Sequence, residues 1–400
     1  MRAYLPKIKF IVLCCIAFTL TSYIWAAPNL IFVYAGLWLL EGGIGQKLKA
    51  FYSNKYAWLF ASLFLLHVVG MIYTSYAQIG WFTIQVKASL IVFPVLFASE
   101  GVMDSKKQKP FMYAFITGCI CNGLICLGYA IWKYYTLHVS EFNYMQFSIF
   151  LHPSYYSMYI DMAIVFIAYL FMSKEISLIT IEKIVLTFCL AFFALMIVLL
   201  QSKAGQITTA LLFVAMLIAL AMKKGVKWRI VMLLGIAIFG AIAYRYISSG
   251  NSRIFSAFQI ASGNMDRKSP ESTQVRYYVW QASMEIIHQH PIIGTGTGDA
   301  DSVLQKQYVK DGDTGALEHH LNSHNEYMQI GVALGCIGVM VLLACLLLPL
   351  FKSIKERRYV YMAFIVIILI NFLVESMLET QAGTMFYGLL NSLLMFNFVI

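Results

Sequence analysis

Charged side chains are scarce in this sequence. Asp, Glu, Lys and Arg make up 12% of its 400 residues, against about 25% in soluble domains. Apolar residues make up 60%, above the roughly 45 to 50% that is usual for soluble domains, and the mean hydropathy is +0.74. This composition excludes a water-soluble globule and a disordered chain, and it indicates an integral membrane protein.

The sequence also lacks a cysteine framework. Its eight cysteines are Cys14, Cys15, Cys119, Cys121, Cys126, Cys189, Cys336 and Cys345. All of them lie inside apolar segments, where a thiol usually packs as a small hydrophobic side chain. Neither a disulfide scaffold nor a zinc site is therefore predicted.

Long apolar runs are abundant instead. A membrane helix needs about 20 apolar residues, because lipid offers the backbone no hydrogen-bond partner. Twelve segments qualify, at about 8–26, 28–43, 57–77, 81–99, 111–133, 154–172, 184–201, 206–222, 229–247, 327–350, 359–378 and 384–400. The sequence predicts an all-α integral membrane protein with about 12 transmembrane helices. Helices 1–9 would fall within 1–247, a long loop would span 248–326, and helices 10–12 would fall within 327–400.

The basic residues predict how the chain is oriented. The net charge is +10, and Lys and Arg lie mostly in short clusters between apolar runs, as the positive-inside rule requires. The first run resembles a signal peptide, but eleven further spans follow, so we interpret it as the first membrane helix. Both termini are then cytoplasmic, and the loop at 248–326 faces outward.

This outer loop is the longest polar stretch, and loops of this length are uncommon unless they carry function. Pro270 and the Ser-Thr pair that follows predict a helix at about 273–290, which Pro291 ends. A further helical stretch is expected at about 300–310. The Gly-Thr-Gly-Thr-Gly run between them has no Lys-Ser/Thr after it, so we interpret it as a tight turn and not as a phosphate cradle.

Three ionisable residues lie in or beside the predicted spans, where a charge is costly and marks a candidate functional site. Lys203 follows the seventh span, Lys87 lies in the fourth and Asp161 in the sixth. Each lysine could instead extend its ammonium group to the membrane interface without any further role. Asp161 is a candidate to pair with a lysine.

Arg276 and His324 are the candidates in the outer loop. Arg276 lies at the start of the expected helix, where a guanidinium group and free backbone amides can grip a phosphate; alternatively it is a solvated charge. His324 lies where the chain re-enters the membrane, and histidine suits proton transfer near neutral pH. Asn325 would cap the next helix and direct its dipole at a nearby anion.

Other histidines are also predicted to face outward. His152 precedes the sixth span and is either an ordinary loop residue or a supporting group. His319 and His320 lie close to His324, but the three lack the spacing typical of a metal site. No metal is therefore predicted.

Three motifs together resemble the O-antigen ligase and polymerase family. They are Ser202-Lys203-Ala204-Gly205 after a span, Arg276-Tyr-Tyr-Val-Trp followed by Pro291-Ile-Ile-Gly-Thr-Gly, and His324-Asn325-Glu326-Tyr327 before Gln-Ile-Gly-Val-Ala-Leu-Gly. Their order, spacing and shared outer location carry the resemblance, as does the architecture of many spans with one large outer loop.

The resemblance implies a metal-independent, inverting glycosyltransferase without a cofactor, at the periplasmic face of the bacterial inner membrane. Its donor would be a glycan on undecaprenyl diphosphate, and its acceptor lipid A core or a growing glycan. In the family's motifs, Arg276 matches the residue that holds the diphosphate and His324 the residue that activates the acceptor. Lys203 stands where many members have arginine, so it keeps the charge but lacks the planar fork. Lys87 is the third candidate for the diphosphate, supported by Asn325 and His152.

Two alternatives stay open. Ligation to lipid A core is favoured over polymerisation, although both activities share these motifs. A transporter or flippase for lipid-linked sugars would explain charges within the spans, but it explains the outer loop less well, and no repeat indicates duplicated halves. A purely structural scaffold would not bring Lys203, Arg276 and His324 together.

Overall fold

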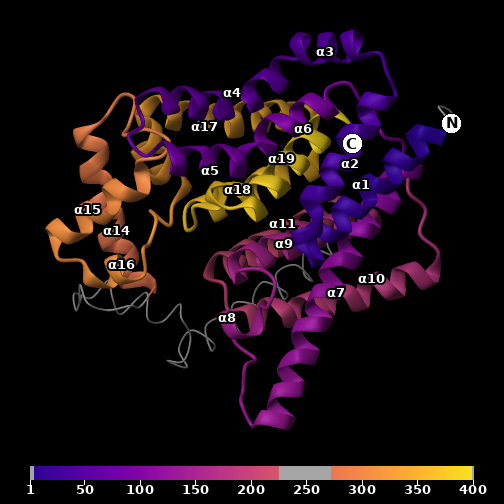
Figure 1. Cartoon of the computed structure of the whole chain (residues 1–400). Coiled ribbons are helices and arrows are strands. Elements are labelled where there is room, and N and C mark those ends of the chain that lie inside the picture. The colour runs from indigo at the N-terminus through magenta and orange to yellow at the C-terminus, as the bar shows by residue number, and fades with distance from the viewer. Residues whose placement is uncertain (1–3, 225–271, 399–400) are drawn as a thin grey trace.

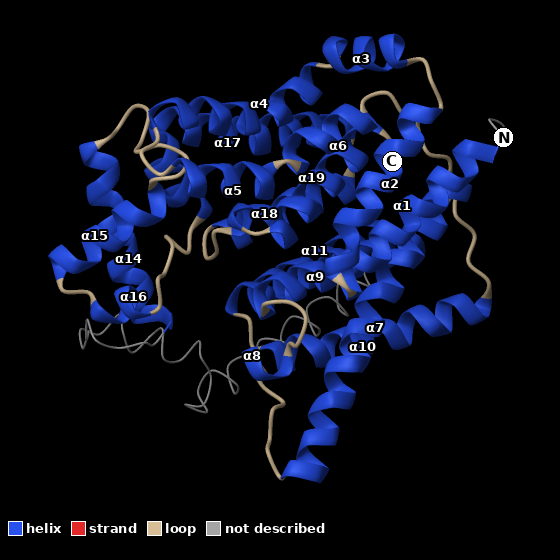
Figure 2. Cartoon of the chain, in the orientation of Figure 1, coloured by secondary structure: helices blue, strands red, loops and turns tan. Residues whose placement is uncertain are grey.

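The computed structural model of the chain describes residues 4–224 and 272–398 (Figure 1). Figure 2 shows that, within these residues, helices are joined by loops and turns with no strand. The predicted all-α class is therefore confirmed for the part of the chain that the structure describes.

The helices follow the apolar runs of the sequence. The first group is α1 (Leu5–Ser22), η2 (Ile24–Ala26), α2 (Ala27–Leu40), α3 (Ile44–Ser53), α4 (Lys55–Gly70), η3 (Met71–Tyr73), α5 (Ala77–Lys87) and α6 (Ser89–Phe97). The second is α7 (Ser105–Leu137), α8 (Tyr144–Phe147), α9 (Pro153–Met172), α10 (Thr180–Leu200) and α11 (Lys203–Lys224). The third is α14 (Ser272–Gln289), α15 (Ala300–Asp311), α16 (Thr314–Glu318), α17 (Glu326–Glu356), α18 (Tyr359–Phe372), η4 (Met377–Glu379) and α19 (Gln381–Phe396).

Seven of these segments are long and apolar enough to cross a bilayer: Leu5–Ser22, Lys55–Tyr73, Ala77–Phe97, Ser105–Leu137, Pro153–Met172, Thr180–Leu200 and Glu326–Glu356. An eighth would be the pair Ile24–Leu40 and Ile44–Ser53, which is bent by 112°. The chain is thus a multi-pass membrane protein by helix length and composition. The expected ninth span, 229–247, lies outside the described residues, so the total of twelve stays a prediction.

α9 lies at the centre of the main core. Of its apolar window 72% is buried, the largest share among the candidate spans. Tyr159 stacks on Phe386 of α19 with ring centroids 4.6 Å apart, and Phe166 meets Phe115 of α7 edge to face at 5.4 Å. Such aromatic pairs add to the packing of buried surface. The residues at the start of α9 are therefore held by the core of the molecule.

The outer-loop helices pack on α17 through a second core. Val279 and Ile286 of α14 and Leu304 of α15 are fully buried there with Val332 of α17. The prediction of helices at about 273–290 and 300–310 is confirmed by α14 and α15. This packing fixes α14, which carries Arg276, against the start of α17.

The glycine run forms a turn that is bound to a break in α17. Gly335 has a φ of +62°, a left-handed conformation that interrupts the helix and that glycine adopts without strain. At this break the carbonyl of Val332 accepts from the amide of Thr295 at 2.9 Å, and the amide of Cys336 donates to Pro291 at 2.8 Å. A Cβ on Gly294 would collide with the backbone of α17. The interpretation of this run as a turn is confirmed.

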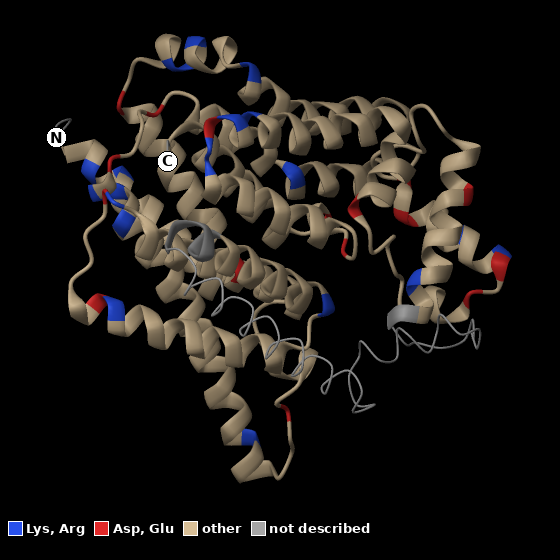
Figure 3. Ribbon diagram, turned by 180° about the vertical axis from the view of Figure 1, so that it is seen from behind, with Lys and Arg blue, Asp and Glu red and all other residues tan. Residues whose placement is uncertain are grey.

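The two ends of the molecule differ in charge. In Figure 3 much of the basic ribbon lies around α3 and the end that carries both termini, whereas α14, α15 and α16 lie at the opposite end (Figure 1). This arrangement is the one expected if the basic loops face the cytoplasm.

Candidate active site

Glu375 is the centre of a polar cluster. It lies between α18 and α19 and is buried. Its Oε1 accepts from Nη2 of Arg276 at 2.8 Å and from Oγ of Ser154 at 3.3 Å, and its Oε2 lies 3.0 Å from Nδ1 of His324. One carboxylate thus joins the two outer-loop residues that the sequence analysis singled out.

The charge of Glu375 is stabilised by its neighbours. Burial by itself would raise the pKa of this carboxyl, but the hydrogen bond from His324 and the electrostatic interactions with His324, Arg276 and His152 lower the pKa to about 2. Opposite charges at hydrogen-bond distance favour the ionised form of a carboxyl. Glu375 is therefore an anion over the whole physiological pH range.

His324 is held in a defined orientation. Its backbone has a φ of +43°, and its amide donates to the side chain of Asn322 at 3.0 Å. When Nδ1 carries the ring proton and donates it to Glu375, Nε2 is left with a lone pair that can accept a proton. A carboxylate that orients a histidine in this way is the arrangement of a general base.

Asn325 caps α17, as predicted. Its Oδ1 accepts from the amide of Met328 at 3.1 Å. Its own amide donates to Ser376 and its Nδ2 to the carbonyl of Leu373. Asn325 therefore also ties the start of α17 to the segment that carries Glu375.

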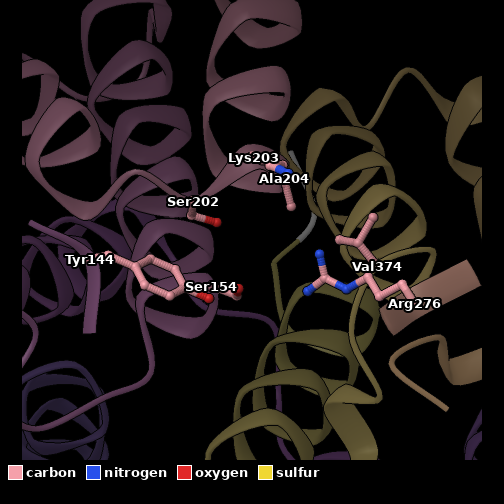
Figure 4. Close-up of a pocket in the computed structure, with 7 residues that line it drawn as sticks. All are labelled: Tyr144, Ser154, Ser202, Lys203, Ala204, Arg276 and Val374. Carbon is pink, nitrogen blue, oxygen red and sulfur yellow. The ribbon is translucent and has the colours of Figure 1, made fainter. Parts of the chain in front are cut away.

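A pocket opens beside this cluster. It is lined by Tyr144, Ser154, Ser202, Lys203, Ala204, Arg276 and Val374. Figure 4 shows the guanidinium of Arg276 reaching into the pocket from one wall, opposite the hydroxyl groups of Ser154 and Ser202, with Lys203 at the top. The structure thus brings Lys203 and Arg276 to the same cavity, and Ser154 and Arg276 connect this cavity to Glu375.

Two helices begin at the pocket. Ser202 precedes α11, and its Oγ accepts from the amide of Gly205 at 3.3 Å. His152 caps α9, because its Nδ1 accepts from the amide of Ser154 at 3.2 Å. Helix N-termini carry partial positive charge and free amide groups. The pocket therefore combines two cationic side chains with two helix N-termini, a combination that suits a polyanion.

Gly205 permits the approach of α11 to α9. A Cβ at this position would collide with the side chain of Ser157. The Lys203-Ala204-Gly205 sequence therefore sets a close helix contact as well as supplying a charge.

Lys87 lies outside this pocket. Its side chain is fully buried, and its Nζ donates to the carbonyl of Leu378 at 2.9 Å and to Glu379 at 2.8 Å. The amide of Leu378 in turn donates to Glu326 at 2.7 Å. Lys87 thus anchors η4, the short helix that begins two residues after Glu375.

Asp161 has a hydroxyl partner. Its Oδ1 accepts from Oγ1 of Thr209 on α11 at 2.5 Å, while its Oδ2 has no partner among the described residues. The expected lysine partner is not present in this part of the chain. Asp161 instead links α9 to α11 below the pocket.

Glu375 and Ser154 are site residues that the sequence did not predict. Glu375 falls near the end of the predicted span 359–378, where a carboxylate is costly, and this signal could have identified it. Ser154 carries no such signal, because a serine in the first turn of a helix is ordinary.

Metal ligands do not gather in the described residues. No group of three His, Cys, Asp or Glu side chains is arranged there as a metal ion would require. His319 and His320 are exposed beyond α16 and are not among the partners of Glu375.

Together, the apolar helices and the His-Glu-Arg cluster describe a multi-pass membrane protein with a buried polar cluster beside a pocket that two cationic side chains line. A family described as O-Antigen ligase matches residues 188–343 of the chain. The resemblance to the O-antigen ligase family is thereby confirmed over this region, which contains Lys203, Arg276 and His324. No curated protein matches the chain.

Proposed function

We propose that this protein is a membrane glycosyltransferase that moves a glycan from undecaprenyl diphosphate to an acceptor hydroxyl group at the periplasmic face of the inner membrane. The observation that carries the proposal is the bridge of Glu375 to Arg276 and His324, at 2.8 and 3.0 Å. The bridge holds an imidazole and a guanidinium group on one carboxylate, beside the pocket that contains Lys203, and this supports a base and a cation acting together.

The donor diphosphate binds in this pocket. Arg276 and Lys203 supply positive charge, and the starts of α9 and α11 supply the positive ends of two helix dipoles. The guanidinium of Arg276 is largely shielded from solvent, with a side-chain exposure of 17%, so its charge acts with little screening from water. Because negative charge grows on the bridging oxygen as the bond breaks, these groups stabilise the transition state more than the bound donor.

His324 accepts the proton of the acceptor. The acceptor oxygen forms a bond to the anomeric carbon of the glycan while the bond from that carbon to the diphosphate oxygen breaks. The diphosphate leaves with the electron pair, and the acceptor's proton moves to Nε2 of His324. Glu375 holds the imidazole through Nδ1 and stabilises its charged form, as the carboxylate does in a catalytic triad.

This single displacement inverts the anomeric carbon and needs no metal. Lys87 contributes through position, since its contact with η4 holds the segment that carries Glu375. His152 caps α9 at Ser154, whose hydroxyl group donates to Glu375, and Asn325 fixes His324 at the start of α17.

We favour ligation of a finished glycan to lipid A core, with polymerisation of repeat units as the alternative. The protein would have twelve spans and cytoplasmic termini, with segment 248–326 in the periplasm. A transporter is the weaker candidate, because transport sites lie near the bilayer midplane, whereas the site described above joins helix ends and interhelical connections.

The test uses a deletion strain complemented with variants. His324→Ala and Arg276→Ala are each expected to reduce transfer at least 100-fold, with unchanged amounts of protein in the membrane. His320→Ala and Arg357→Ala, at exposed positions, serve as matched controls and should retain activity. Full activity of either site variant would remove that residue from the mechanism.

The glycan profile of the deletion strain separates the two activities. Loss of all long glycan on lipid A, with polymer accumulating on the carrier, indicates a ligase. Core capped with a single repeat unit indicates a polymerase. Unchanged turnover in the presence of a chelator would support the metal-independent mechanism, and loss of turnover would contradict it.

A further inference from the structure

A second pocket borders η4, the short helix that begins two residues after Glu375. It is lined by His67, Ile79, Thr83, Thr297, Gly298, Ala300, Asp301, Gln329, Ala333 and Glu379. These residues come from α4, α5, the glycine turn, α15, α17 and η4. Nothing in the proposed donor site uses this cavity.

The second pocket contains hydrogen-bonding capacity that the described residues do not satisfy. His67 is 1% exposed, and its Nε2 has no partner among them. A buried polar atom of this kind costs free energy unless something pairs with it. This orphaned nitrogen in the wall of a pocket indicates a polar ligand.

The two pockets differ in charge. Lys203 and Arg276 line the first, whereas the carboxyl groups of Asp301 and Glu379 line the second. The pKa of Asp301 is raised by burial and by the negative charge of Glu379. Among the described residues, the lining of the second pocket contains no Lys or Arg, and Glu379 is already paired with Lys87. Hydroxyl groups could donate to the carboxylates and exchange hydrogen bonds with amide, imidazole and threonine side chains.

The second pocket is linked to the proposed base. Gln329 lines the pocket, and its Nε2 donates to Asp301 at 3.1 Å. Its Oε1 accepts from the amide of Ser323, the residue before His324, at 3.0 Å. A ligand that contacts Gln329 therefore lies one hydrogen bond from the backbone that presents His324, and one that contacts Asp301 lies two hydrogen bonds from it.

The second pocket also borders an apolar outer surface. Ile79 lines it and is 41% exposed, and the neighbouring Trp81 and Phe82 on α5 are 62% and 65% exposed. Aromatic side chains of this kind are typical of the membrane interface. A ligand held by lipid could thus enter from the side of α5.

From these observations we infer that the second pocket binds the acceptor: an uncharged, polyhydroxylated sugar that is carried on a lipid. Its occupant would be the sugar whose hydroxyl group His324 deprotonates. The inference rests on the proposed glycosyl transfer and assigns to the second substrate a site that the donor does not occupy.

The test measures the two substrates separately with the purified full-length protein in detergent. The donor is lipid-linked glycan extracted from cells, the acceptor is purified lipid A core, and farnesyl diphosphate is a competitor of the donor. The variants are Asp301→Asn, which removes the charge of a carboxyl group in the pocket wall, and Thr83→Met, whose longer side chain should fill the pocket. Thr136→Met is the matched control, because Thr136, like Thr83, only bonds the carbonyl four residues before it, and it is exposed on α7.

Both pocket variants are expected to raise the KM for lipid A core about tenfold, while the KM for the donor and inhibition by farnesyl diphosphate change less than twofold. Thr136→Met should match the wild type. The inference is overturned if the donor KM rises instead, if neither KM changes, or if a chelator reproduces the variants' effect, since that would make the carboxylates a cation site.

The design distinguishes the two proposals. If the wild-type protein transfers glycan and the pocket variants have the same KM for the acceptor, only the acceptor assignment is overturned. A wild-type protein that transfers glycan neither to lipid A core nor to a purified glycan repeat overturns the proposed function and the acceptor assignment with it. If the glycan repeat is the substrate, its KM is the quantity expected to rise.

Discussion

Arg276 of α14 donates a hydrogen bond to Glu375 at 2.8 Å across a sequence separation of 99 residues. The side chains of both residues are mostly shielded, with exposures of 17% and 8%. A pair in such surroundings is more strongly coupled than a surface ion pair. The contact therefore fastens the outer-loop helix to the connection between α18 and α19, and with it the whole candidate site.

The ionised form of Glu375 should stabilise the fold in a pH-dependent way. Its pKa is lowered from the ordinary 4.5 to about 2, so this stabilisation is complete above about pH 4.5 and is lost as the pH falls through about 2. A shift of this size corresponds to about 3 kcal/mol.

Thermal unfolding in detergent checks this expectation. Glu375→Gln should unfold at a lower temperature than the wild type at neutral pH. The difference between the two unfolding temperatures should decrease as the pH is lowered from about 5 to about 3. A difference in unfolding temperature that stays constant between these pH values would show that the charge of Glu375 does not contribute to stability.

Lys203 should act mainly through its charge. Lys203→Ala is expected to raise the KM for the lipid-linked donor at least tenfold, because one of the two cations of the pocket is lost. Lys203→Arg should keep or improve donor binding, since a guanidinium group can bind phosphate with two hydrogen bonds. Lys133→Ala, which removes the 2.7 Å pair between Lys133 on α7 and Glu141 in the loop that follows, is the control. An unchanged donor KM in Lys203→Ala would argue against a role in binding.

The local features of the site could be predicted from the sequence, whereas its connections could not. Arg276 on a helix, Asn325 as a cap and the glycine turn each follow from residues within a few positions of one another. The carboxylate that joins Arg276 to His324 lies 51 residues from the histidine, and no local pattern relates the two.

The contacts of Lys87 could not be predicted from the sequence either. Its position within a predicted span indicated a functional charge, but a span does not reveal which residue meets a side chain from another helix. The contact of Lys87 with Glu379, 292 positions away, depends on how α5 packs against η4. The orphaned nitrogen of His67 and the pocket around it are likewise products of packing.

The contact between α1 and α7 predicts that alanine substitutions at two glycines of α7 have different effects on thermal stability. A Cβ on Gly118 would collide with Thr21 and with the backbone of Phe18, whereas a Cβ on Gly128 would meet nothing within 4 Å. Small residues allow membrane helices to approach closely. Gly118→Ala should therefore lower the unfolding temperature by several degrees.

Gly128→Ala is the matched control. It should leave the unfolding temperature unchanged or raise it slightly, because alanine favours a helix over glycine by about 1 kcal/mol. Equal effects of the two substitutions on thermal unfolding would mean that the close approach of α1 to Gly118 does not limit stability.

Removing both charges of the Lys87–Glu379 ion pair should restore part of the stability that is lost when only the charge of Lys87 is removed. Lys87→Met leaves a carboxylate in the wall of the second pocket without its ammonium partner, and breaking a buried pair in this way typically costs about 3 to 5 kcal/mol. Adding Glu379→Gln removes the uncompensated charge, so the double variant should unfold at a higher temperature than Lys87→Met alone.

The same variants distinguish a positioning role of Lys87 from direct binding of diphosphate. If Lys87 only holds η4 and Glu375 in place, the double variant should recover part of its turnover together with its stability, at an unchanged KM for the donor. If Lys87 binds the diphosphate, the donor KM should rise in Lys87→Met and stay high in the double variant, because neutralising Glu379 does not restore a cation. Measuring stability and donor KM on the same preparations therefore separates the two roles.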